Sequence, residues 1–218
     1  MLLSPCLSAQ KGKPFTVPAG KKIEDCIPFE ERFRFPEFTT GKVFFTQGTN
    51  ADAKLNFNFL TREMVYIEGQ DTLAIANPTD IRQIIIDGNI FIMNKGYMEV
   101  ISNSKIPVGL RQYFNLMNER KKDPYGEMAA GAATTSYSSL HTDGHYYKLT
   151  QDHDRIFQKV TEYFLATSNS GFVPFTKKKV IGLFPQKKKE IEDYLISNKV
   201  NFDSREDLIR FAGYLSDL

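Results

Sequence analysis

Between residues 41 and 119 the chain repeats one pattern, in which a short apolar stretch is followed by a tight turn. In the stretch 53–60, Leu55, Phe57 and Phe59 alternate with Asn56 and Asn58. A period of two predicts a β-strand with one dry face and one wet face. Further stretches with the length and composition of strands are 41–45, 63–68, 72–76, 80–86, 89–93, 97–102 and 106–119.

The turns between these stretches are short. Asp87-Gly88 or Gly88-Asn89 predicts a two-residue hairpin, because these residue types tolerate positive φ. Sequential strands joined by tight turns indicate an antiparallel meander. The pattern fits an open sheet and a partial barrel equally well.

From Thr176 the apolar spacing becomes helical. Thr176 is a candidate N-cap, Pro185 suits the first position of a second helix, and Asn198 is expected to end that helix. Asp203 with Glu206, or Ser204 with Asp207, predicts a cap for a last helix. Its expected apolar stripe is Leu208, Phe211, Ala212 and Leu215. The predicted fold class is therefore α+β: an antiparallel β-rich body over 41–175, then a small helical tail over 176–218 that packs on the body.

Two further segments differ from the body in composition. Residues 10–40 contain several prolines and glycines, which predict an irregular lead-in with its phenylalanines packed on the domain. Residues 118–145 are polar and rich in small residues, which predicts a flexible loop within the body. We expect two final strands after that loop, at 145–150 and 161–166.

The first nine residues resemble the end of a secretory signal. Leu2, Leu3 and Leu7 are apolar, and small residues precede a possible cleavage after Ala9. Export to the periplasm or the cell exterior is the first expectation. The alternatives are lipid anchoring through Cys6, which Pro5 disfavours, and a cytoplasmic protein. No apolar run is long enough for a transmembrane helix.

The charge balance gives no reason to expect a nucleic-acid partner. The formal net charge is +2, so no strong field attracts a polyanion. Two lysine triplets, 177–179 and 187–189, are followed by several acidic residues and lack interleaved aromatic residues. This composition is typical of a solvated helix face, and it lacks a stacking platform for bases.

All three histidines lie in one short stretch, LHTDGHYYKLTQDHD, at 140–154. His141, His145 and His153 are the candidate metal ligands, provided that the turn carrying His153 folds beside the other two. The chain has no HExxH, CxxC, GxSxG, P-loop or dinucleotide motif. We therefore assign no catalytic residue, no cofactor-binding residue and no cofactor.

Three stretches resemble uncharacterised exported proteins of Bacteroidetes: KLNFNFLTREMVYIEGQDTLAIANPTDI, the DPYG tract at 123–126, and LFPQKKKEIEDYLISNKVNF with DLIRFAGYL. The resemblance covers roughly residues 40–218. It implies a signal peptide, an envelope location and no established activity. The resulting expectation is a non-catalytic exported protein that binds a protein or small-molecule partner. The alternative is a metal-dependent hydrolase that uses the three histidines.

Overall fold

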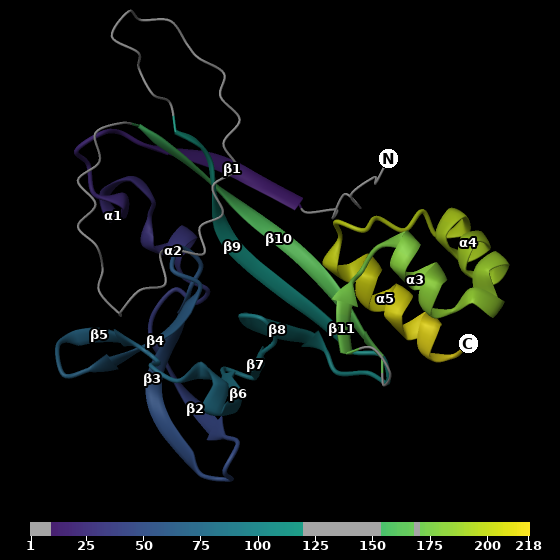
Figure 1. The fold of residues 1–218 in the computed structure, drawn as a ribbon, viewed down its shortest axis with the longest axis horizontal. Coiled ribbons are helices and arrows are strands. Elements are labelled where there is room, and N and C mark those ends of the chain that lie inside the picture. The colour runs from purple at the N-terminus through teal and green to yellow at the C-terminus, as the bar shows by residue number, and fades with distance from the viewer. Residues whose placement is uncertain (1–9, 120–153, 168–170) are drawn as a thin grey trace, which may run out of the picture. The chain divides into compact units, whose positions relative to one another are not determined.

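The computed structural model describes residues 10–119, 154–167 and 171–218. Its strands form one antiparallel sheet that is not closed, in the order β1-β10-β9-β8-β7-β6-β2-β3-β4-β5, with β11 paired to β10. This arrangement, followed by helices near the C-terminus, confirms the predicted α+β class and decides for an open sheet (Figure 1). In the described part of the chain, no helix is long and apolar enough to cross a membrane.

The strands are β1 (Gln10–Val17), β2 (Thr39–Phe45), β3 (Asn50–Asn58), β4 (Glu63–Glu68), β5 (Asp71–Ala74), β6 (Ile81–Ile86), β7 (Asn89–Met93), β8 (Tyr97–Ser102), β9 (Val108–Glu119), β10 (Arg155–Thr167) and β11 (Gly171–Pro174). The helices are α1 (Ile23–Cys26), α2 (Phe29–Arg32), α3 (Lys177–Leu183), α4 (Lys188–Ser197) and α5 (Arg205–Ser216), with short 3₁₀ turns η1 (Pro78–Asp80) and η3 (Pro185–Lys187). The eight expected strand positions, from 41–45 to 106–119, coincide with β2 to β9 within a few residues.

Internal contacts divide the chain into two compact units, and each is described by itself. Of the described residues, 11–88, 112–119 and 154–160 form the hairpin unit. Residue 10 and residues 89–111, 161–167 and 171–218 form the helical unit.

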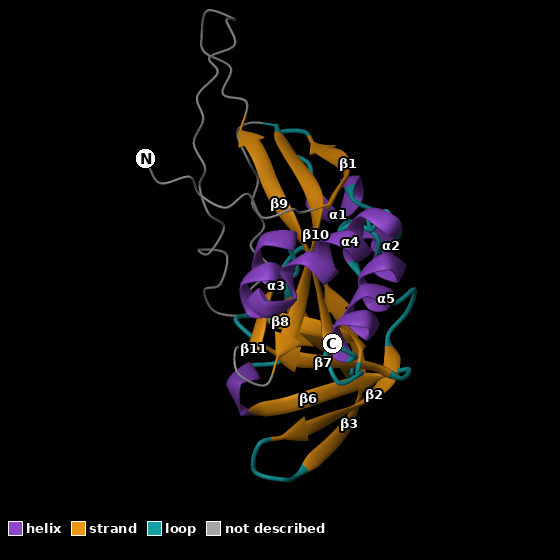
Figure 2. Cartoon of the chain, turned by 90° about the vertical axis from the view of Figure 1, so that its right-hand side faces the viewer, coloured by secondary structure: helices purple, strands orange, loops and turns teal. Residues whose placement is uncertain are grey.

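In the hairpin unit, β2 pairs with β3 and β6, β3 pairs with β4, and β4 pairs with β5, all antiparallel. Figure 2 shows β2, β3 and β6 side by side. After β6, Asp87 and Gly88 have φ values of 48° and 75°. Two consecutive positive φ values are the requirement of a two-residue hairpin turn, so the first of the two predicted turn positions is correct.

The lead-in is more regular than its prolines and glycines predict. Residues 10–17 form β1, and two four-residue helices follow before residue 33. The partner of β1 is β10, which lies more than a hundred residues later in the sequence; a side-chain bond from Gln158 Nε2 to the Gly12 carbonyl, 2.8 Å long, links the two. A pairing partner so distant in sequence leaves no local signal.

The expected wet face of β3 is also different in the structure. Asn56 and Asn58 are both fully buried, like the apolar residues between which they alternate. The chain around Phe33 lies beside this end of β3, with an antiparallel bridge from Phe33 to Asn58. The Asn56 side chain bonds to the backbone of Phe35 and Glu37 in this segment, which takes its amide out of contact with water.

The core of the helical unit joins the C-terminal helices to strand residues. One cluster of buried apolar side chains contains Val108 of β9 and Leu165 of β10 together with Val180 of α3, Ile191 of α4 and Phe211 of α5. The helices α3, α4 and α5 form one group at the C-terminal end of the chain (Figure 1). The predicted stripe of the last helix is buried along its whole length, at Leu208, Phe211, Ala212 and Leu215.

The helix boundaries follow local signals. The Thr176 side chain accepts a hydrogen bond from the Lys179 N–H, and the Ser204 side chain accepts one from the Asp207 N–H. Pro185 occupies the first position of η3, and Asn198 is the C-cap of α4. The second of the two predicted caps for the last helix is therefore the one present.

Candidate functional site

The three histidines proposed as metal ligands, His141, His145 and His153, lie outside the described residues, as do the loop after residue 119 and the strand expected at 145–150. The other strand expected after the loop, 161–166, lies within β10. Within the part of the chain that the structure describes, no group of three or more His, Cys, Asp or Glu side chains is placed to hold a metal ion. Asp154, next to His153, accepts a hydrogen bond from the Ala19 N–H at 3.0 Å.

A small hollow lies where the end of α4 meets the start of α5, in the helical unit. It is lined by Tyr194, Asn198, Val200, Asp207 and Arg210, and its volume is about 70 Å³. Small-molecule sites usually have several hundred Å³. The hollow therefore has room for a few water molecules or for the end of one side chain.

Tyr194 is held rigidly at the edge of this hollow. Its ring stacks on Tyr214 at a centroid distance of 3.9 Å and on Phe211 at 5.5 Å, with interplanar angles of 15° in both cases. Phe211 in turn stacks on Phe175 at 5.7 Å. Because its ring is fixed by this stack, Tyr194 loses little conformational entropy when another group packs against it.

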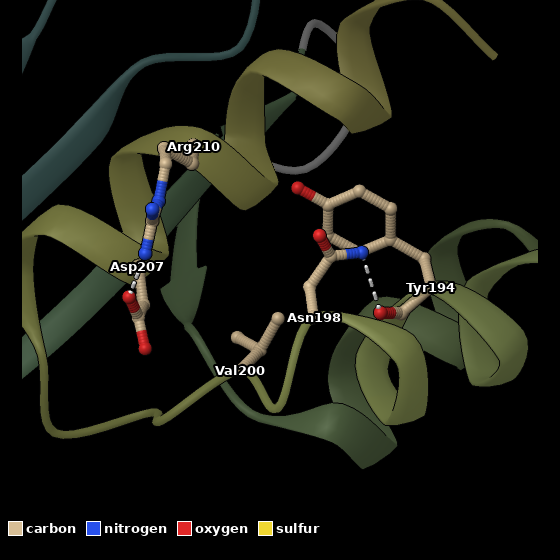
Figure 3. A pocket seen from close by; sticks show the side chains of 5 residues that line it. All are labelled: Tyr194, Asn198, Val200, Asp207 and Arg210. Carbon is tan, nitrogen blue, oxygen red and sulfur yellow. Dashed lines mark hydrogen bonds and ion pairs between the residues drawn. The ribbon is translucent and has the colours of Figure 1, made fainter.

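Asp207 and Arg210 form an ion pair on the opposite side of the hollow from Tyr194 (Figure 3). Asp207 also accepts a hydrogen bond from the Asn201 N–H at 2.9 Å, and its own N–H donates to Ser204 Oγ at 3.3 Å. The hydrogen bond from the Asn201 N–H, and to a smaller extent the one from the Arg210 guanidinium, lower the pKa of the Asp207 carboxyl below its ordinary value of 3.8. The carboxylate is thus ionised at neutral pH and holds Arg210 in place.

The remaining groups of the hollow can bind a partner's polar atoms. Asn198 Nδ2 donates to the Tyr194 carbonyl at 3.0 Å, which fixes the amide at the end of α4. Arg210 has its side chain 71% exposed, and one of its two terminal nitrogens is used for Asp207. A guanidinium has five N–H donors, so others can reach an acceptor that enters the hollow. Val200 adds an apolar contact.

The lysine triplets on the neighbouring helices have acidic partners close by. Lys177 pairs with Glu192 at 3.4 Å, and Lys187 pairs with Glu190 at 3.1 Å. The other members of the triplets, at 178, 179, 188 and 189, are exposed. Exposed pairs of this kind contribute little to stability, so the lysines form a solvated face with local charge compensation.

The sequence identified the parts of this hollow without identifying the hollow. Asn198 was predicted as a helix end, and Asp207 as part of a helix cap. Their assembly depends on how residues 199–204 return the chain from α4 to α5. Lys199, with a φ of 48°, makes that return possible, and no pattern in the sequence indicates such a φ at a lysine.

Comparison of the chain with protein-family models, with curated proteins and with solved structures finds no match in any of the three.

Proposed function

We propose that this is a non-catalytic binding protein of the cell envelope, which docks a partner protein at the hollow between α4 and α5. The observation that carries the proposal is the combination of a rigid Tyr194, a mostly exposed Arg210 and a volume that fits one side chain. Tyr and Arg are enriched among the residues that dominate binding energy at protein interfaces.

The size and chemistry of the hollow favour a protein partner over a free small molecule. A volume of about 70 Å³ is less than half of the 150 Å³ or so that accommodates benzene in an engineered protein cavity. A partner's side chain can enter such a hollow while the surrounding surfaces supply the rest of the contact. Arg210 supplies donors, so the side chain that enters is expected to present an oxygen acceptor.

Location in the envelope is supported by the apolar and small residues at 2–9 and by the resemblance to exported proteins of Bacteroidetes. Fractionation of cells that express the native gene, followed by N-terminal sequencing, tests this. A mature chain that starts at Gln10 in the periplasmic fraction is expected, and an uncleaved chain in the cytoplasm contradicts export.

Docking at the hollow is tested by photo-cross-linking in cells that express the native gene. A photoreactive residue replaces Ser197, an exposed position next to Asn198. One discrete cross-linked product is expected. The product should be lost with Arg210→Ala and weakened with Tyr194→Phe, because both variants remove donors from the hollow.

Lys189→Ala is the matched control for Arg210→Ala. Lys189 is an exposed cation on α4, the helix that carries the photoreactive residue, but it does not line the hollow. Its cross-linked product should equal that of the unmodified protein. Equal loss with Lys189→Ala and Arg210→Ala would show that charge in general, and not the hollow, is responsible.

The hydrolase alternative from the sequence is separated from the binding proposal by metal analysis. Elemental analysis of protein purified without chelators would give a stoichiometric metal, lost in His145→Ala, if the histidines formed a site. That result would replace the binding proposal with the hydrolase.

A further inference from the structure

No further inference is drawn: the strongest candidate, the surface patch of exposed lysines at 178, 179, 188 and 189 on α3 and α4, carries nothing because Glu192 and Glu190 pair with the neighbouring Lys177 and Lys187 and nothing in the structure shows what covers the patch.

Discussion

The helices at 176–218 and the segment at 32–38 both bury aromatic side chains, but they are held by different kinds of interaction. Each long C-terminal helix begins or ends at a residue whose partner lies three or four positions away, as Ser204 with Asp207. The segment around Phe35 is held instead by Asn56, which lies 21 residues later on β3. The difference teaches that proximity in sequence, and not strength of the interaction, decides what a sequence reveals.

The interactions of Asn56 show how much the distant partner contributes. Its Oδ1 accepts from the N–H groups of Phe35 at 3.0 Å and Phe57 at 2.9 Å, and its Nδ2 donates to the carbonyls of Phe35 at 2.9 Å and Glu37 at 3.3 Å. One buried amide therefore satisfies both backbone groups of Phe35. Every hydrogen-bonding atom of this side chain is used, which explains why a fully buried asparagine is tolerated.

The largest expected effect concerns the helical side of the comparison. Phe211→Ala should lower the free energy of unfolding by about 4 kcal/mol, because it leaves a cavity among stacked rings at a fully buried position. Chemical denaturation monitored by circular dichroism measures it. Ile196→Ala, at an exposed position of α4, should change stability by less than about 0.5 kcal/mol. Similar losses in both variants would mean that the stripe is not the core of this unit.

Asn56→Ala should lower the free energy of unfolding by about 3 kcal/mol, because buried backbone groups of Phe35 lose their partners. Hydrogen exchange at the Phe35 amide is the local readout, and its protection should fall most. Asn198→Ala is the matched control, since this exposed amide caps one carbonyl at the end of α4. If the two asparagine variants are equally stable, the hydrogen bonds of Asn56 to residues 35–37 contribute no more to stability than an ordinary helix cap.

The comparison also explains which parts of the fold could be predicted. The hairpin at Asp87-Gly88, the cap at Thr176 and the stripe of α5 each depend on neighbours within a few residues, and all three are present. The strand β1 and the burial of Asn56 depend on chain segments far away in sequence, and both were missed. A period of two reports which residues share a face, but it does not report what covers that face.

The candidate site also depends on contacts that are distant in sequence. The sequence directed attention to three histidines because they cluster within 13 residues, and these lie outside the described residues. The hollow between α4 and α5 was not predicted, although Asn198 was predicted as a helix end and Asp207 as part of a helix cap. Its geometry arises from the turn at Lys199, where a positive φ at a non-glycine residue has no local signature.

A smaller effect is expected at the cap of α5. Ser204→Ala should lower the free energy of unfolding by about 1 kcal/mol, because the Asp207 N–H loses its acceptor. Thr176→Ala, which removes the corresponding cap of the seven-residue α3, allows a direct comparison of two caps by thermal denaturation. Ser204 caps the helix that carries Asp207 and Arg210, so of the two variants only Ser204→Ala is expected to disturb the residues of the hollow. Restoration of stability by Ser204→Asp would confirm that the lost acceptor is the cause.

The smallest expected effect is a change of stability with pH that comes from Asp207 on α5. Because the folded pKa of Asp207 lies below its ordinary value of 3.8, ionised Asp207 stabilises the folded state. That contribution is fully present above the ordinary pKa and is lost as the pH falls through the lowered one. The free energy of unfolding of Asp207→Asn should therefore differ most from that of the unmodified protein at neutral pH, with a difference that shrinks below about pH 4.

Urea denaturation at a series of pH values measures this difference. Asp193→Asn, which removes an exposed carboxylate on α4, is the control. A difference that grows on acidification would mean that Asp207 is less favourably placed when it is charged, and the account of the Asp207–Arg210 pair would fail.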